Sequence, residues 1–202
     1  MNVTEYLQKW SVSYRDDMLG NIMPFWLKHG LDLRNGGVYT CLDRDGSLID
    51  TTKSVWFQGR FAFTCSYAYN HIEQNPEWLA AAKSTIDFIE QHCFDSDGRM
   101  FFEVTASGEP LRKRRYVFSE TFAAIAMAEY AIASGEREYA EKALKLFKDI
   151  QRFLNTPGVL EPKYWNTVQS KGHSIVMILI NTASRIRAAI ADPALDKQID
   201  DS

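Results

Sequence analysis

Residues 117–133, with the sequence VFSETFAAIAMAEYAIA, are the most informative part of the chain. The stretch has helical periodicity, but between Phe122 and Met127 it has no polar face. A helix that is apolar on all sides is covered by its neighbours. The stretch therefore predicts an inner helix of a multi-helix protein, which closes before Ser134 and Gly135.

The other helical segments are of two kinds. Some contain runs that are apolar nearly all round, whereas others are amphipathic, as is typical of helices with one face in water. The two kinds alternate along the chain, which indicates helical hairpins arranged side by side, with the second member of each pair lining the interior. Inner helices are expected at 54–71, 117–133 and 173–190, and outer helices at 4–18 (extended after a break by 21–29), 76–92 and 137–154.

The connections follow the same alternation. Links after inner helices are short, whereas links before them are long, at roughly 30–53, 94–116 and 155–172. Loops of this length in a compact domain are usually functional. The alternation places the N-termini of the inner helices at the end where the long loops arrive, so a pocket is expected there.

Two of the long loops contain Asp-Gly turn signals, DRDG at 43–46 and DSDG at 95–98. Asp-Gly supplies the positive φ angles of a tight turn, so each signal predicts a β-hairpin. A calcium site is the less favoured interpretation, because the later ligands of an EF-hand are missing.

The composition excludes several classes of function. A net charge of −3 leaves no basic surplus for nucleic acid, and no apolar run approaches the roughly 20 residues of a membrane span. Three cysteines, an odd number without C-x-x-C spacing, and the absence of a signal peptide predict reduced thiols in a cytoplasmic protein with no structural metal. Signatures of dinucleotide enzymes, P-loop ATPases, α/β-hydrolases and zincins are missing. Aromatic residues make up 13%, a supply that suits the walls of a sugar-binding cavity.

Arg60 is the most conspicuous polar residue, near the start of an inner helix in the stretch WFQGRFAF at 56–63. A guanidinium there is costly to bury unless it is paired or bound to a ligand. Two interpretations are open: a ligand contact, or a structural ion pair for which Glu120 on the neighbouring inner helix is the candidate partner.

His173 and Glu120 are expected at the same end of the structure as Arg60. His173 lies at the start of the last inner helix, where the helix dipole favours a neutral ring that can accept a proton; a capping or loop role is the alternative. Glu120 lies in the first turn of its helix, an ordinary place for a carboxylate. The preceding run RKRR at 112–115 predicts a solvated loop, with a phosphate patch or nuclear signal as the weaker interpretation.

Several of these stretches resemble the N-acylglucosamine 2-epimerase family, also described as renin-binding protein-like. They follow each other in family order through nearly the whole chain, and they are closer to the acylglucosamine epimerases than to the cellobiose epimerase or aldose–ketose isomerase branches. The stretches are GGVYTCLDRDG (36–46), KSVWFQGR (53–60), DGRMFFEV (97–104), RKRRYVFSE (112–120) and GHS (172–174) before an apolar helix.

The resemblance implies an all-α fold, the (α/α)6 barrel, a ring of six helical hairpins. The six expected helices form half of such a ring, so residues 1–202 are expected to be one domain and the N-terminal half of a family chain. The resemblance also implies a sugar epimerase that interconverts N-acetylglucosamine and N-acetylmannosamine by removing and returning the C2 proton.

By this resemblance, Arg60 would bind the substrate oxygen on which negative charge develops, and His173 would contact the sugar near C1 and C2. Tyr39, Trp56 and Glu120 are further candidates for the substrate-binding wall. The acid–base histidine pair of the family belongs to its second half, so no catalytic residue is assigned here and the short chain is not expected to be fully competent alone. No cofactor is expected, apart from ATP as an allosteric effector of some family members.

Alternative functions stay open. A related aldose–ketose isomerase or a cellobiose or mannose epimerase would use the same kind of pocket. A glycoside hydrolase or lyase would need two flanking carboxylates, of which only Glu120 is a candidate. A non-catalytic truncated module would bind a partner or form a homodimer through the apolar sides of its inner helices.

Overall fold

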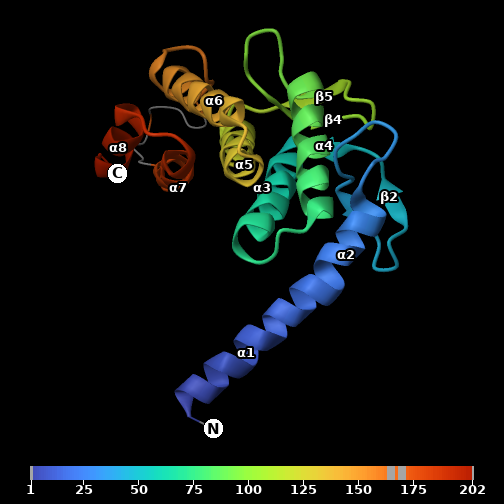
Figure 1. Ribbon diagram of the computed structural model, residues 1–202. Coiled ribbons are helices and arrows are strands. Elements are labelled where there is room, and N and C mark those ends of the chain that lie inside the picture. Colours follow the sequence, from blue (N-terminus) through green and yellow to red (C-terminus); the bar gives the residue numbers. More distant parts are fainter. Residues whose placement is uncertain (1, 163–166, 168–171, 202) are drawn as a thin grey trace.

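The computed structural model describes residues 2–162, 167 and 172–201. The expected inner helices are present close to their predicted bounds, and each packs against its inner neighbour and against outer helices. Figure 1 shows the resulting row of helical hairpins. The inner helices are α3 (Val55–His71), α5 (Phe118–Ser134) and α7 (Ser174–Ala189), and the outer ones are α4 (Pro76–His92), α6 (Arg137–Asn155) and α8 (Pro193–Asp200).

Helix α5 lies at the centre of the core. It packs against α3, α4, α6 and α7, and every residue from Ser119 to Ala131 is buried, as its lack of a polar face predicts. Gly59 allows α3 to approach it closely, because a Cβ at this position would lie 2.6 Å from the carbonyl carbon of Phe122. The helix ends at Gly135, whose φ of 75° is a left-handed conformation that glycine adopts without strain.

The first helix departs from its predicted role. It forms one helical run to residue 30, without the expected break, and its first part projects away from the other helices (Figure 1). The prediction that it packs as an outer helix is therefore wrong for α1 (Val3–Asp17), which has no buried residue because no described segment packs on its apolar stripe. Local interactions support it, namely a capping box between Asn2 and Glu5 and ring contacts joining Tyr6, Trp10 and Tyr14. The run continues through wide π-type turns at Met18–Ile22 and Trp26–Gly30 that flank α2 (Met23–Phe25).

The long loops form more sheet than expected. The first hairpin, β1 (Cys41–Leu42) with β2 (Leu48–Asp50), surrounds the DRDG turn as predicted. The DSDG turn closes only a single bridge between Phe94 and Met100. Its strand instead joins a three-stranded sheet in the order β3 (Lys53–Ser54), β4 (Phe101–Val104) and β5 (Pro110–Lys113), so the prediction missed β3 and β5.

A buried lysine ties these loops together. Lys53 is fully buried, and its Nζ donates to Asp32 Oδ2 at 2.8 Å and to the carbonyl oxygens of Gly36 at 2.7 Å and Ala106 at 2.9 Å. All three N–H donors of the ammonium are thereby satisfied. Burial lowers the pKa of Lys53, and Asp32 partly offsets this effect. Burial alone would raise the pKa of Asp32, but hydrogen bonds from Lys53 and Asn35 hold it well below its usual value.

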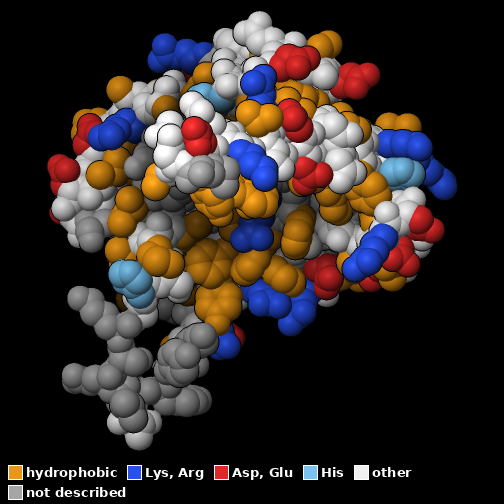
Figure 2. All heavy atoms as spheres, turned by 90° about the horizontal axis from the view of Figure 1, so that it is seen from below, with side chains coloured by type: hydrophobic (Ala, Val, Ile, Leu, Met, Phe, Trp, Pro, Cys, Tyr) orange, Lys and Arg blue, Asp and Glu red, His pale blue; other side chains and the backbone are white. Residues whose placement is uncertain are grey.

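Hydrophobic side chains also remain on the surface. Figure 2 shows one face on which such side chains gather, with Lys and Arg side chains beside them. In the part of the chain that the structure describes, no helix combines the length and apolar character needed to cross a bilayer. Nor do three or more His, Cys, Asp or Glu side chains of the described residues converge as metal ligands would. Large exposed apolar side chains include Leu7 and Val12 on α1, Phe57 on α3, and Met177 and Ile180 on α7.

Candidate functional site

An open cavity of about 340 Å³ lies where the first turns of α3, α5 and α7 meet. This is the end of the inner helices at which the alternation of short and long links predicts a pocket. The lining is mostly apolar, with a single charged side chain. The residues are Trp56 and Arg60 from α3, Phe118 and Phe122 from α5, and Ser174, Met177 and Ile178 from α7.

Arg60 provides the charge in this cavity. Its guanidinium carbon lies 4.2 Å from the ring centre of Phe122 and 6.0 Å from that of Trp56. Arg60 is exposed rather than buried, and no carboxylate of the described residues forms an ion pair with it. The ion pair with Glu120 that the sequence suggested is therefore not formed. A guanidinium held on an aromatic ring, without a carboxylate partner among the described residues, can bind an oxygen on which negative charge develops.

Trp56 forms the aromatic part of the wall. Its ring centre lies 5.1 Å from that of Phe102 and 5.4 Å from that of Phe118, in both cases edge to face. These contacts hold the indole in one orientation beside Arg60. The structure thus brings together Arg60 and Trp56, two of the residues predicted from the sequence, and gives them a shared aromatic support.

Glu120 lies close in sequence to this wall but does not line the cavity. It is fully buried, and its Oε1 accepts hydrogen bonds from Arg99 Nε at 2.7 Å and from the backbone N–H of Met100 at 3.0 Å. Arg99 also donates to the carbonyl oxygens of Arg114 and Tyr116. The pair therefore fastens the loop between α4 and α5 to the first turn of α5. Arg99 lies in the stretch DGRMFFEV, but nothing in the local pattern marked it as the partner of Glu120.

Tyr39 and His173 occupy different surroundings. Tyr39 is half-buried and lies next to Lys53, whose Nζ is 5.3 Å from its ring centre. Burial and the neighbouring Asp32 raise the pKa of this phenol, which is not among the residues lining the cavity. His173 is exposed at the start of α7, directly before Ser174 of the cavity wall. Its side chain makes no capping hydrogen bond. The expected loop at 155–172 includes residues outside those described.

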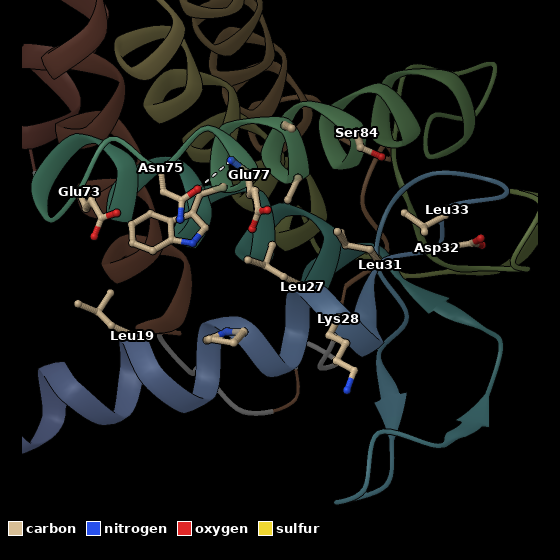
Figure 3. A pocket seen from close by; sticks show the side chains of 14 residues that line it. Leu19, Leu27, Lys28, Leu31, Asp32, Leu33, Glu73, Asn75, Glu77 and Ser84 are labelled. Atoms are coloured by element: carbon tan, nitrogen blue, oxygen red, sulfur yellow. Dashed lines mark hydrogen bonds between the residues drawn. The ribbon is translucent and has the colours of Figure 1, made fainter.

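A larger groove lies elsewhere, with a volume of about 850 Å³, between the N-terminal helical run and α4 (Figure 3). Leu19 and Leu27 lie on the helical run and face α4, whereas Lys28 points away from it. Asp32 also lines this groove, but its carboxylate is bound to Lys53. The smaller cavity is the candidate site, because it combines the cation of Arg60 with an aromatic wall at the end of the inner helices where a pocket is expected.

Comparison with known proteins agrees with the resemblance. The family model for N-acylglucosamine 2-epimerase matches residues 37–182. The chain belongs to the N-acylglucosamine 2-epimerase family. Among its curated relatives, the bovine N-acylglucosamine 2-epimerase is 30% identical over 177 residues, or 85% of this chain. The human N-acylglucosamine 2-epimerase is 28% identical over 92% of this chain, and a cellobiose 2-epimerase of Ruminococcus albus is 31% identical over 68%.

The chain spans less than half the length of these family members, 42% of the bovine protein and 44% of the human one. Among solved structures, the cellobiose 2-epimerase of Bacillus thermoamylovorans has a TM-score of 0.84 at 20% identity, over 96% of this chain and 54% of that one. An α-1,6-mannanase of Salegentibacter has a TM-score of 0.65 at 19% identity. These likenesses concern the fold, and they confirm the prediction of an (α/α)6-barrel fold represented here by about half of its helices.

Proposed function

We propose that this chain contributes the Arg60-bearing half of a sugar 2-epimerase site. The proposed reaction interconverts N-acetylglucosamine and N-acetylmannosamine by removing the C2 proton and returning it on the opposite face. Family membership supports the reaction class. The observation that carries the proposal is the unneutralised guanidinium of Arg60 on the Phe122 ring, inside a cavity with an aromatic wall.

The chemistry requires a cation or hydrogen-bond donor at the sugar oxygen. In the ring-opened sugar, the C2 proton lies next to the aldehyde, and its removal moves negative charge onto O1. A guanidinium that is already in place stabilises this enediolate without reorganisation at the moment of reaction. Arg60 is assigned this role, with Trp56 as the wall and His173 as a contact near C1 and C2. Proton transfer itself needs groups that this chain is not assigned.

The cavity supports hydrolysis less well than epimerisation. Glycoside hydrolysis generally uses two carboxylates that flank the scissile bond. The described residues that line the cavity include no carboxylate, and Glu120 is already bound to Arg99. Related aldose isomerases and cellobiose or mannose epimerases differ from the proposed enzyme in the sugar that they use. The test therefore includes mannose and cellobiose.

Cofactor use, cellular location and association with other chains are also part of the proposal. The proposed reaction uses no cofactor, because it moves only a proton; ATP enters at most as an allosteric effector. The free thiols of Cys41, Cys65 and Cys93 support a cytoplasmic location. The exposed apolar side chains of α1, α3 and α7 support association, either with a remaining half of the ring or as a homodimer.

Saturation-transfer NMR tests the binding step on this chain. N-acetylmannosamine, N-acetylglucosamine, mannose and cellobiose are offered in turn, and an N-acylated hexosamine is expected to receive the strongest transfer. Arg60→Gln should weaken binding about tenfold, because it removes a charge-assisted hydrogen bond. Arg185→Gln is the matched control, since Arg185 rests on Tyr67 in the same way but does not line the cavity.

The chemical step is followed by exchange of the C2 proton of N-acetylmannosamine in deuterated water. Exchange is expected from a chain extended to the full length of its relatives and should fall sharply in its Arg60→Gln variant. Silence from that extended chain with every sugar tried would refute epimerase chemistry. Release of reducing ends from oligosaccharides would favour a hydrolase instead.

A further inference from the structure

The basic run at 112–115 is not used by the proposed function. Its side chains alternate in direction because the run begins in strand β5. Successive side chains of a strand point to opposite faces. Lys113 in β5 turns to one side, where its Nζ lies 2.6 Å from Asp95 Oδ2 and 2.7 Å from Asp97 Oδ2. Arg112 and Arg114 turn to the other side, toward Phe102 on β4. Lys113 is thereby neutralised, whereas the two arginines meet an aromatic ring.

Both arginines are held in place without a counter-charge. The guanidinium carbon of Arg114 lies 3.8 Å from the ring centre of Phe102, and that of Arg112 lies 5.4 Å from it. In the described part of the chain, neither forms an ion pair with a carboxylate. The Nε of Arg114 is buried and has no hydrogen-bond acceptor among the residues that the structure describes. A buried donor without an acceptor is costly, and an absent anion or water is one of the few explanations for it.

The run lines a polar cavity of about 330 Å³. Tyr116 and Glu161 complete the lining of this cavity. Glu161 is the acidic residue of the set, and it makes no ion pair with the arginines. Arg115 donates to the carbonyl oxygen of Pro162 at 3.3 Å, and this neutral acceptor leaves the charge of Arg115 unneutralised. The cavity therefore carries a surplus of guanidinium groups, whose planar N–H pairs match the oxygens of phosphate and carboxylate.

Trp56 connects this cavity to the candidate site. Its ring centre lies 6.0 Å from the guanidinium carbon of Arg60 and 5.9 Å from that of Arg114. Phe102, which supports Arg114, is also the edge-to-face neighbour of Trp56 at 5.1 Å. The two guanidinium groups are therefore separated by no more than the sum of those two distances to Trp56. A sugar that carries a phosphate or carboxylate is long enough to span a separation of this size past Trp56.

We propose that Arg112 and Arg114, supported by Phe102, form an oxyanion subsite beside the Arg60 cavity, and that this subsite makes a sugar with a phosphate or carboxylate bind more tightly than its neutral counterpart. The part of the proposal that concerns a sugar rests on the proposed function. The anion subsite stands on the unneutralised arginines alone and is testable without turnover. No bond is made or broken in this step, because the arginines only bind and orient.

Isothermal titration calorimetry compares N-acetylmannosamine with N-acetylmannosamine 6-phosphate and with the corresponding uronate, using the whole chain. The better of the two anionic sugars is expected to bind at least tenfold more tightly than the neutral one, and the two arms separate phosphate from carboxylate. Arg112→Gln combined with Arg114→Gln should abolish that advantage. Arg185→Gln is the matched control, because it removes a guanidinium that rests on the Tyr67 ring but lines neither cavity.

Equal affinity of the wild type for neutral and anionic sugars would overturn the proposal. An equal loss in Arg185→Gln would also overturn it, because that result would indicate general charge attraction. If no sugar binds, the proposed function fails, and inorganic phosphate alone then tests the subsite. Phosphate binding that survives in Arg185→Gln but not in the double variant supports the subsite. Binding that is unchanged in the double variant, or absent from the wild type, refutes it. Should circular dichroism show the double variant unfolded, Arg112→Gln carries the same comparison, since Arg112 is exposed.

Discussion

Two sets of cations lie near the starts of the inner helices, and they differ in what neutralises them. Lys53 and Arg99 are buried, and each has a carboxylate oxygen within 2.8 Å, from Asp32 and Glu120 respectively. Arg60, Arg112 and Arg114 rest on aromatic rings and have no carboxylate partner among the described residues. The first set is satisfied within the protein, whereas the second is the set that we propose to bind another molecule. Neutralisation, rather than position, separates the structural cations from the candidate ligand contacts.

The two sets also differ in the free energy that depends on them. Removing one member of a buried ion pair leaves an uncompensated charge away from water, which is strongly destabilising. Arg60 and Arg112, which are exposed and rest on aromatic rings, contribute much less to stability because their charges are already solvated. Substitutions in the first set should therefore act on folding, and substitutions in the second set on binding.

Lys53→Met should have the largest effect. The variant leaves the Asp32 carboxylate buried without its cation, so the free energy of unfolding is expected to fall by about 3–5 kcal/mol. Arg60→Met, the matched change in the other set, should cost less than about 1 kcal/mol. Urea denaturation followed by circular dichroism measures both. Similar losses in the two variants would break the distinction between the two sets.

Glu120→Gln should have a smaller effect on folding and none on sugar binding. The amide can still accept from Arg99 and Met100 but loses its charge, so a loss of about 2–3 kcal/mol is expected. Because Glu120 does not line the cavity, saturation transfer to N-acetylmannosamine should be unchanged at a temperature where the variant is folded. A selective loss of sugar binding would instead show that Glu120 contributes to the substrate-binding wall, as the family resemblance implies.

The Asp32–Lys53 pair should also make stability depend on pH. The pKa of Asp32 is lower in the folded state than in the unfolded state, so its stabilising contribution is present above the unfolded value of 3.8 and is lost as pH falls through the folded value. Asp32→Asn is expected to cost about 2 kcal/mol at pH 7. The difference from the wild type should narrow as urea midpoints are measured from pH 5 toward pH 3. A constant difference would contradict a charged Asp32 in the folded state.

The sequence predicts the helices better than it predicts these pairs. Residues 122–127 lack any polar face, so the burial of α5 follows from local pattern alone. Helix α8 was missed because its eight residues give little periodicity, although Asp192 and Pro193 form a recognisable start signal. Asp192 indeed caps this helix by accepting from the backbone N–H of Ala194.

The candidate site was predictable only in part, for a related reason. The place of the cavity and the presence of Arg60 beside it follow from helix alternation, whereas Trp56 was a candidate only through the family resemblance. The partners of Lys53 and Glu120 each lie 21 residues away along the chain, in irregular loops without hydrophobic periodicity. The sequence therefore placed Glu120 at the correct helix turn but could not show that the loop carrying Arg99 covers it.

The smallest expected effect concerns Cys93, a thiol close to the buried ammonium of Lys53. A nearby cation normally activates a thiol, but the charge of Lys53 is taken up by Asp32, and burial raises the pKa of Cys93 to about 12 in spite of it. Cys65 has a similarly raised pKa from burial, whereas Cys41 is exposed. A thiol reagent such as Ellman's should therefore modify one cysteine of the native chain rapidly and all three in denaturant. Rapid modification of Cys93 in the native chain would mean that the charge of Lys53 stabilises the thiolate of Cys93 despite the ion pair with Asp32. Lys53 could then no longer be counted as a cation that is satisfied within the protein.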